Sequence, residues 1–292
     1  MTATRTDNPA RDSRRVAVVA GGGKLPVEVA KALAARGEKP PIFLADGEAD
    51  GDFRDYEQVR MPIEAIGKLP AELHRRGVTH VVLAGTIGRR PKWWRIVPAP
   101  SLLTELPAAI KGLASGDDTL LRVLVRFLER QGIGVLGAHE IVPEMLAPEG
   151  ALTRLAPQAS DWRDLDAAYA AARAIGALDI GQAAVAIGGR AIALEGIEGT
   201  DGLLARTRDL RGHGRIAGRS RGVLVKCAKP AQELRADLPT IGPDTVEAAH
   251  AAGLAGIGVE TGRSLILEAK RVVERAEALG LFVVGLSQAK EP

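Results

Sequence analysis

Cysteine is nearly absent from this chain, which has Cys227 alone among its 292 residues. One thiol cannot form an intramolecular disulfide or supply a cysteine pair for zinc, so we expect a reducing compartment. Long apolar runs are also missing, since no stretch approaches the roughly 18 apolar residues of a membrane span. Residues 1–14 are polar, which predicts a disordered tail and argues against a signal peptide. These absences together predict a cytoplasmic protein.

Several familiar motifs are missing as well. The chain has no Gly-x-Ser-x-Gly elbow, and its five histidines form no His-x-x-x-His pair. Its glycine cluster, "GGGKLP" at 21–26, lacks the glycine spacing of a dinucleotide fingerprint and the Gly-Lys-Ser/Thr of a P-loop. The sequence therefore gives no support for an elbow-type serine hydrolase, a histidine-pair zinc enzyme or a P-loop nucleotide hydrolase.

Charge is unevenly distributed, although the formal net charge is only +3. From residue 206 to residue 229, eight basic residues stand against the single acid Asp209, a local balance of +7. The basic residues are Arg206, Arg208, Arg211, Arg215, Arg219, Arg221, Lys226 and Lys229. Such a stretch is typical of a solvated basic face, of phosphate on a ligand, of an acidic membrane surface or of nucleic-acid binding.

The first half of the chain alternates short apolar runs with helical patterns. The stretch "VAVVAGGGKLPVEVAKALAARG" predicts a strand, a glycine turn and a helix, and further strands are expected at 41–45, 79–85 and 133–142. Helices are expected at 65–77, where Pro70 interrupts the pattern, and at 117–132, where Asp117 or Asp118 is a plausible N-cap. This alternation predicts an α/β fold class, with a Rossmann-like parallel sheet over residues 15–143.

The second half is organised differently. Three prolines and no sustained period between residues 143 and 161 predict a linker, which we place at 144–160. A helix is expected at 162–179, followed by two apolar runs about Gly188-Gly189, which is a hairpin signal. A second pair of runs flanks Thr261-Gly262, and a helix and a strand close the chain. Residues 161–292 therefore predict a mixed α+β domain.

Two loops of the first half are candidate ligand sites. Gly21, Gly22 and Gly23 lie between a strand and a helix, where bare amides favour an anionic group such as phosphate. A tight turn alone is the other interpretation. Gly85 and Thr86 follow the third expected strand, at the carboxyl end where open α/β sheets bind ligands.

A tryptophan pair follows the second of these loops. In "RRPKWWR", Trp93 and Trp94 stand among four basic residues. This composition suits an interfacial membrane surface or an acyl chain with a charged head, and core packing of one tryptophan is the alternative.

Acids near the basic stretch are candidate metal ligands. Glu195, Glu198 and Asp201 leave a strand and enter a helix, and Asp237 follows the basic stretch in "RADLPTIG". Carboxylates and phosphate-binding cations in one domain are what magnesium-assisted phosphoryl chemistry requires. Asp201 could instead be a helix-start acid, and Asp237 a turn cap or the partner of Arg235. Cys227 is expected to be a small buried hydrophobe, not a nucleophile.

Several segments together resemble the LpxI-type UDP-2,3-diacylglucosamine pyrophosphatase family. They include "AGGGKLPVEVA", "GDDTLLRVLV", "GAHEIV", "LDIGQAAV", "EGTDGLL", "VLVKCAKPAQELRADLPTIG", "AAGLAGI" and "LGLFVVG", in this order. The likeness runs from about residue 15 to residue 287 and is most specific from Lys226 to Gly242. It implies a two-domain hydrolase of lipid A biosynthesis that splits UDP-2,3-diacylglucosamine into UMP and 2,3-diacylglucosamine 1-phosphate. The motifs of the calcineurin-like enzymes that perform the same step are absent.

The resemblance also implies Mg²⁺ as cofactor and a catalytic second domain. It places the essential acid on Asp237 and makes Lys226 and Lys229 candidates for pyrophosphate contacts. The substrate-binding candidates are Gly22, Gly23, Gly85, Thr86, Thr200 and Thr240, and the expected metal ligands are Asp237, Asp201 and Glu195. Of these, Glu195, Thr200 and Asp201 are added mainly for their chemistry and not from the resemblance. Such a Mg²⁺ would neutralise pyrophosphate oxygens and lower the pKa of a bound water.

The expected partner is the amphiphilic nucleotide-sugar lipid, and nucleic acid is not expected. A peripheral contact with the cytoplasmic face of the inner membrane and a homodimer remain open. Two other classes also remain open: a nucleotide-cofactor oxidoreductase, for which Asp46 is suitably placed, and a non-catalytic membrane- or nucleic-acid-binding protein.

Overall fold

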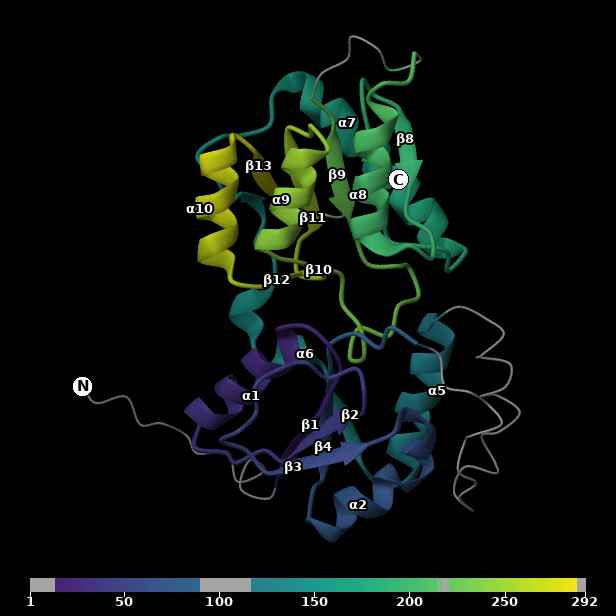
Figure 1. Cartoon of the computed structure of the whole chain (residues 1–292), viewed down its shortest axis with the longest axis vertical. Helices are drawn as coiled ribbons and strands as arrows, with labels where there is room; N and C mark the ends of the chain where they lie inside the picture. The colour runs from purple at the N-terminus through teal and green to yellow at the C-terminus, as the bar shows by residue number, and fades with distance from the viewer. Residues whose placement is uncertain (1–13, 90–116, 215, 217–220, 288–292) are drawn as a thin grey trace, which may run out of the picture. The chain divides into compact units, whose positions relative to one another are not determined.

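The computed structural model describes residues 14–89, 117–214, 216 and 221–287 (Figure 1). The chain divides into two compact units, Met1–Val142 and Pro143–Pro292, and each is described by itself. The Trp93–Trp94 motif and all but the last residue of the expected tail lie outside the described residues. Among the helices that are described, none is both long and apolar enough to cross a bilayer.

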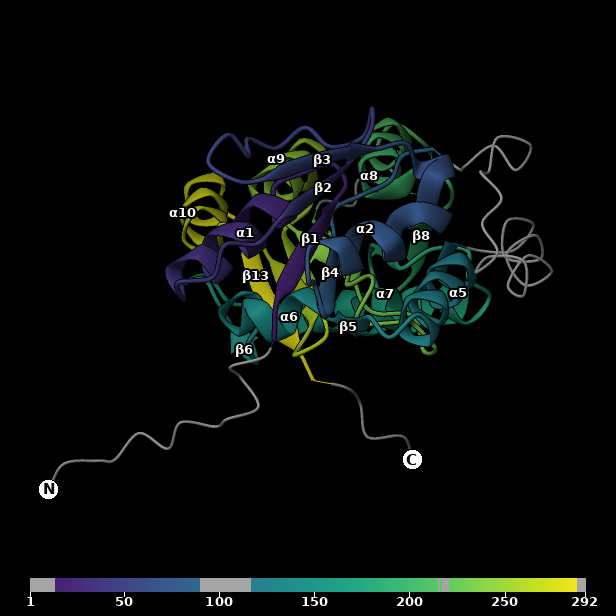
Figure 2. The same cartoon turned by 90° about the horizontal axis from the view of Figure 1, so that it is seen from below.

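A parallel sheet forms the centre of the first unit. Its strands run in the order β3-β2-β1-β4-β5 (Figure 2), and all neighbouring pairs are parallel. The strands are β1 (Val16–Ala20), β2 (Ile42–Ala45), β3 (Gln58–Met61), β4 (His80–Ala84) and β5 (Gly134–Leu136). β1, β2 and β4 are apolar runs buried along nearly their whole length, as in sheets covered on both faces. The predicted Rossmann-like sheet is confirmed.

Helices lie between these strands in the chain or follow the last of them. Those described are α1 (Leu25–Ala35), the 3₁₀ turn η2 (Ile63–Lys68), α2 (Leu69–Arg75), α5 (Asp117–Arg130) and α6 (Ala138–Ile141), which comes after β5. Pro70 lies in the first turn of α2, where its missing N–H has no helical partner to lose, so it starts the helix and does not interrupt it. The strand predicted at 133–142 is wrong beyond Leu136, because Gly137 caps α6 and its N–H donates to Glu140 Oε1 at 2.7 Å.

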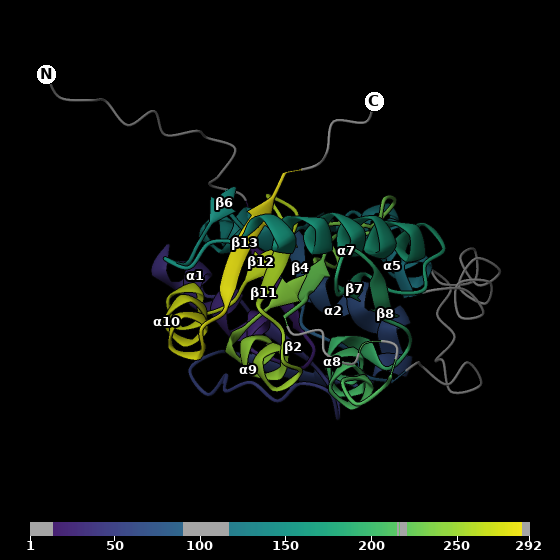
Figure 3. The ribbon, with the colours of Figure 1, turned by 90° about the horizontal axis from the view of Figure 1, so that it is seen from above.

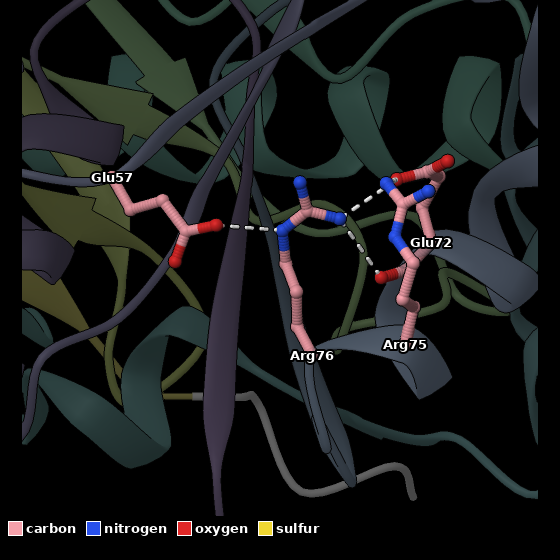
Figure 4. A network of polar contacts seen from close by, with 4 residues as sticks. All are labelled: Glu57, Glu72, Arg75 and Arg76. Carbon is pink, nitrogen blue, oxygen red and sulfur yellow. Dashed lines mark hydrogen bonds and ion pairs between the residues drawn. The ribbon is translucent and has the colours of Figure 1, made fainter.

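An arginine network anchors α2 to the edge of this sheet (Figure 4). Arg76 donates from Nε to Glu57 Oε1 at 2.7 Å, and Glu57 directly precedes β3. The Nη1 atom of Arg76 pairs with Glu72 Oε2 at 2.7 Å, and Arg75 contacts the same carboxylate. The Arg76 guanidinium also lies 5.5 Å from the centre of the Phe43 ring. Since the described contacts of Arg76 are structural, we assign it to the fold and not to the site.

A mixed six-stranded sheet forms the centre of the second unit. Its order is β6-β13-β11-β9-β7-β8, with β13, β11 and β9 mutually parallel and the other neighbouring pairs antiparallel. The strands are β6 (Gly150–Ala151), β7 (Ala183–Ala186), β8 (Ala191–Leu194), β9 (Val223–Lys226), β11 (Gly256–Glu260) and β13 (Phe282–Leu286). A separate parallel pair joins β10 (Thr240–Ile241) to β12 (Leu265–Ile266). The predicted mixed α and β domain is confirmed.

Helices cover both faces of the second sheet (Figure 3). They are α7 (Ala159–Ala177), α8 (Gly199–Leu210), α9 (Pro243–Ala251) and α10 (Ala269–Leu279). α7 packs on one face through Leu165, Ala168 and Ala172. The other three helices share a core with the opposite face, which includes Leu203 of α8 and Val246 of α9.

Two expectations for the second half need correction. The segment predicted as a linker contains β6, which pairs with β13. The runs around Thr261-Gly262 do not form a hairpin, because β11 lies in the main sheet while β12 pairs with β10. The hairpin at Gly188-Gly189 is confirmed: β7 and β8 are antiparallel and Ile187 N–H donates to Arg190 O at 2.9 Å.

Candidate functional site

The two predicted loops of the first unit meet at one point. β1 lies between β2 and β4, so the chain leaves β1 toward one side of the sheet and later returns to add β4 on the other side. Open α/β sheets bind ligands at such a point, outside the carboxyl ends of the strands. The loop after β1 and the loop after β4 are bonded to each other: Gly22 N–H donates to Thr86 O at 2.8 Å, and Thr86 N–H donates back at 3.0 Å. The structure therefore brings together Gly22, Gly23, Gly85 and Thr86.

The close approach of these loops explains two of their glycines. A Cβ added to Gly21 would lie 2.3 Å from Thr86 O, so no side chain fits without a backbone shift. Gly85 has φ +86°, and a Cβ there would lie 2.5 Å from Gly22 O. Only glycine satisfies both the left-handed conformation and the contact at this position.

The amides of Gly21, Gly22 and Gly23 each donate a hydrogen bond within the fold, whereas the sequence predicts bare amides. Gly21 donates to Ala84 O at 2.8 Å, Gly22 donates to Thr86, and Gly23 donates to Asp50 Oδ1 at 2.8 Å. This arrangement favours the tight-turn interpretation of the cluster. A phosphate contact at this loop stays a prediction.

Acids at the same edge of the first sheet fix the loop after β4. Glu48 accepts from Gly88 N–H at 2.7 Å, and Arg89 pairs with Glu64 at 2.6 Å and with Glu48 at 3.4 Å. Glu48, Asp50 and Glu64 could not be predicted from the sequence, because acids that bind loop amides or a loop arginine occur at no characteristic spacing. Their described contacts are within the fold, so we assign them an anchoring role.

Four of the predicted residues of the second unit, Lys226, Lys229, Asp237 and Thr240, lie on β9, on the loop that follows it or at the end of that loop. β9 ends at Lys226, which pairs with Ala183 at the start of β7 and with Val259 near the end of β11. The loop 227–239 leaves from this edge and carries Lys229 and Asp237. Lys226 Nζ donates to Thr240 O at 3.1 Å, which joins β9 to the segment after Asp237.

Asp237 is half-buried and is held by a glutamine. Gln232 Nε2 donates to Asp237 Oδ2 at 2.7 Å and lies 3.4 Å from Gln182 Oε1. Arg235, which we had considered as the partner of Asp237, pairs with Glu233 at 2.8 Å. Sequence reasoning missed Gln182 and Gln232, because uncharged amides give no signal until the fold brings them to a carboxylate.

The second predicted lysine has a partner of its own. Lys229 Nζ lies 2.5 Å from Asp179 Oδ1, and 14% of its side chain is exposed. Its charge is therefore balanced within the fold, whereas the contact described for Lys226 is to a carbonyl oxygen. A direct pyrophosphate contact by Lys229 would require this ion pair to open.

The three acids expected to share a metal do not form a cluster. Glu195 is buried and uses both oxygens in the fold, accepting Gln182 N–H at 2.7 Å and the Thr200 hydroxyl at 2.6 Å. Asp201 is exposed in the first turn of α8, where a carboxylate favours the helix dipole. Across the described part of the chain, no three His, Cys, Asp or Glu side chains are grouped as a metal site.

A buried carboxylate that sequence reasoning missed supports the same loop. Glu260, at the end of β11, is fully buried and accepts Ala228 N–H at 2.8 Å, the Tyr169 hydroxyl lies 3.3 Å away, and Arg263 lies 3.8 Å away. Burial, together with the charge of Glu260, raises the pKa of Tyr169 to about 12. Only 1% of Cys227 is exposed, which confirms the interpretation of this residue as a small buried hydrophobe, and burial raises the pKa of its thiol to about 12.

Comparison with known proteins matches both units. Residues 15–145 match the family model described as the LpxI N-terminal domain, and residues 148–284 match the LpxI C-terminal domain. A curated protein of Caulobacter vibrioides, UDP-2,3-diacylglucosamine pyrophosphatase LpxI, is 40% identical over 283 residues, which cover 96% of this chain and 100% of the relative. Among solved structures, CobK precorrin-6A reductase aligns over 96% of this chain and 90% of its own, with 14% identity and a TM-score of 0.34, which is too low to support any argument.

Proposed function

The chain belongs to the LpxI family, and we propose that it hydrolyses the pyrophosphate bond of UDP-2,3-diacylglucosamine in lipid A biosynthesis. Water adds to one phosphorus, the bridging P–O bond breaks, and the products are UMP and 2,3-diacylglucosamine 1-phosphate. The proposal is supported by the activity in the name of the Caulobacter relative and by the presence of both family domains in the same order.

The observation that carries the proposal is the edge of the second sheet around Asp237. A half-buried carboxylate, oriented by Gln232, lies on a loop whose two ends border Lys226 and Thr240. The loop thus carries an acid and begins next to a lysine, and charges of both signs fixed by the fold suit charge stabilisation during phosphoryl transfer. We propose Asp237 as the essential acid and Lys226 as the cation that approaches the phosphates.

We also propose that the enzyme uses Mg²⁺, held by Asp237 and by the phosphates of the substrate. Mg²⁺ keeps several waters and is usually bound through one or two carboxylates plus substrate phosphates, so one partly exposed carboxylate fits it. Glu195 fits less well as a ligand, because it is buried and each of its oxygens already accepts a hydrogen bond within the fold. Among the described residues, no three acids are grouped as a metal site, so the proposal rests on Asp237 alone. When bound, the ion would neutralise phosphate charge and lower the pKa of a bound water.

An apolar rim beside this edge supports a peripheral contact with the inner membrane, where a diacylated substrate resides. We define the rim by four exposed apolar side chains that are close in sequence to Gln182 or Glu195: Leu178, Ile180, Leu194 and Ile197. Exposed apolar patches often mark interaction surfaces. We propose that the rim lies against lipid; the double variant Leu178→Ser/Ile197→Ser should then co-sediment less with anionic vesicles, and Leu155→Ser, at an exposed leucine outside the rim, should bind them as the wild type does.

The test of the function is incubation with UDP-2,3-diacylglucosamine, with Mg²⁺ or with a chelator, followed by analysis of the products. Release of UMP that stops with the chelator is expected. Turnover of a nicotinamide or flavin cofactor without UMP would favour the oxidoreductase. Salt-dependent DNA or vesicle binding without UMP would favour the non-catalytic alternative.

A further inference from the structure

Gln232 has more described contacts than its place in a surface loop would require. Only 8% of the residue is exposed. Its Oε1 accepts Lys229 N–H at 2.9 Å, and its Nε2 donates to Asp237 Oδ2 at 2.7 Å and lies 3.4 Å from Gln182 Oε1. Both ends of the carboxamide are therefore used within the site.

The orientation of this carboxamide is fixed by its partners. A backbone N–H can only donate, so the atom facing Lys229 N–H must be the carbonyl oxygen of Gln232. The NH₂ group is then directed at Asp237, which as a carboxylate can only accept. Exchanging the two ends would place donor against donor and acceptor against acceptor, so the local chemistry selects one orientation.

The loop that carries this contact is attached to the sheet at two strands. Cys227 N–H donates to Gln182 O at 3.0 Å, next to β7, and Ala228 N–H donates to the buried Glu260 at the end of β11. Gln182 thus contacts the loop through its carbonyl oxygen and its side chain. These hydrogen bonds fix the start of the loop. Gln232, on the same loop, then holds the side chain of Asp237, which is five residues further along the chain, through its own hydrogen bond.

We propose that Gln232 is a positioning residue for the reaction: its amide holds one oxygen of Asp237 so that the carboxylate is presented to the pyrophosphate in a single orientation. The inference rests on the proposed function. One N–H donor occupies one of about four lone-pair sites of a carboxylate, so it orients the group without using up its capacity. Gln182, directly before β7, supports the same amide.

The test compares variants at Gln232 with a matched control. Gln232→Met keeps the size of the side chain and removes both hydrogen bonds. Gln232→Glu keeps an acceptor for Lys229 N–H, and so keeps the turn closed, but replaces the donor that faces Asp237 with a second carboxylate. Gln58→Met is the control, because Gln58 Nε2 donates to Phe53 O within the first unit and has no proposed role in the reaction.

We expect kcat for UMP release to fall about 10- to 100-fold in both Gln232 variants, as when the supporting partner of a catalytic carboxylate is lost. The KM should stay within about threefold, because Gln232 orients Asp237 and has no proposed contact with the substrate. Gln58→Met should retain wild-type kinetics. If Gln232→Met fails to fold, Gln232→Glu decides the matter.

Two failures can be told apart. A wild-type protein that releases no UMP overturns the proposed function and this inference with it. An active wild type with an equally active Gln232→Glu variant overturns the inference alone. A rise in KM at unchanged kcat would also contradict it, since that pattern belongs to a substrate-binding residue.

Discussion

The contact between the two glycine loops predicts that Gly85→Ala destabilises the first unit far more than Gly37→Ala. The two glycines have similar backbone conformations, with φ of +86° at Gly85 and +82° at Gly37. An alanine in such a conformation costs roughly 1–2 kcal/mol at either position. A Cβ at Gly37 has no neighbour within 4 Å, whereas a Cβ at Gly85 lies 2.5 Å from Gly22 O and 2.8 Å from Pro26 Cγ.

The contact at Gly85 adds an overpacking cost of about 1–3 kcal/mol. Hydrogen exchange of the β1 and β4 amides, followed by mass spectrometry, measures the opening free energy of this region. Exchange in Gly85→Ala should be about 5- to 150-fold faster than in Gly37→Ala, since 1.4 kcal/mol corresponds to a factor of ten. Equal acceleration in the two variants would refute the close packing of the loops.

Two further predictions concern titratable groups. Cys227, whose pKa is raised to about 12 by burial, should not react with a disulfide reagent at pH 8 in the native protein and should react fully in urea; rapid native labelling would contradict its burial. Burial, followed by the charge of Arg14, lowers the pKa of His80, so the folded state favours the neutral ring. The free energy of unfolding should therefore be highest above the unfolded-state pKa of His80, about 6.5, and should decrease as the pH falls below that value. Urea titrations from pH 8 to pH 5 should show a smaller decrease in the free energy of unfolding for His80→Gln than for the wild type. An identical decrease in the two proteins would contradict the lowered pKa of His80.

The first sheet was largely predictable because its central strands are uninterrupted apolar runs. β3 was missed: its sequence, QVRM, alternates between exposed and half-buried residues at the edge of the sheet and has no apolar run. The error at 137–142 has a different cause. There Gly137 and Glu140 form a helix start inside a stretch whose composition also suits a strand.

The site was predictable only where a motif or a charge marked it. Asp237 was found through the family resemblance of its segment, and the geometry places it at the sheet edge where Lys226 ends β9. The described residues hold no group of three acids that would share a metal, so the structure gives no support for placing Glu195 and Asp201 with Asp237; residue chemistry alone does not predict distances. Gln182 and Gln232 could not be found in the sequence, since antiparallel pairing of β7 with β9 is what brings them together.

The most direct measurement of the account is UMP release by Asp237→Ala beside that of Asp244→Ala, an exposed acid at the start of α9. We expect Asp237→Ala to lose turnover while it still binds UDP-2,3-diacylglucosamine, and Asp244→Ala to match the wild type. An Asp237→Ala protein that releases UMP at the wild-type rate would contradict the assignment of Asp237 as the essential acid.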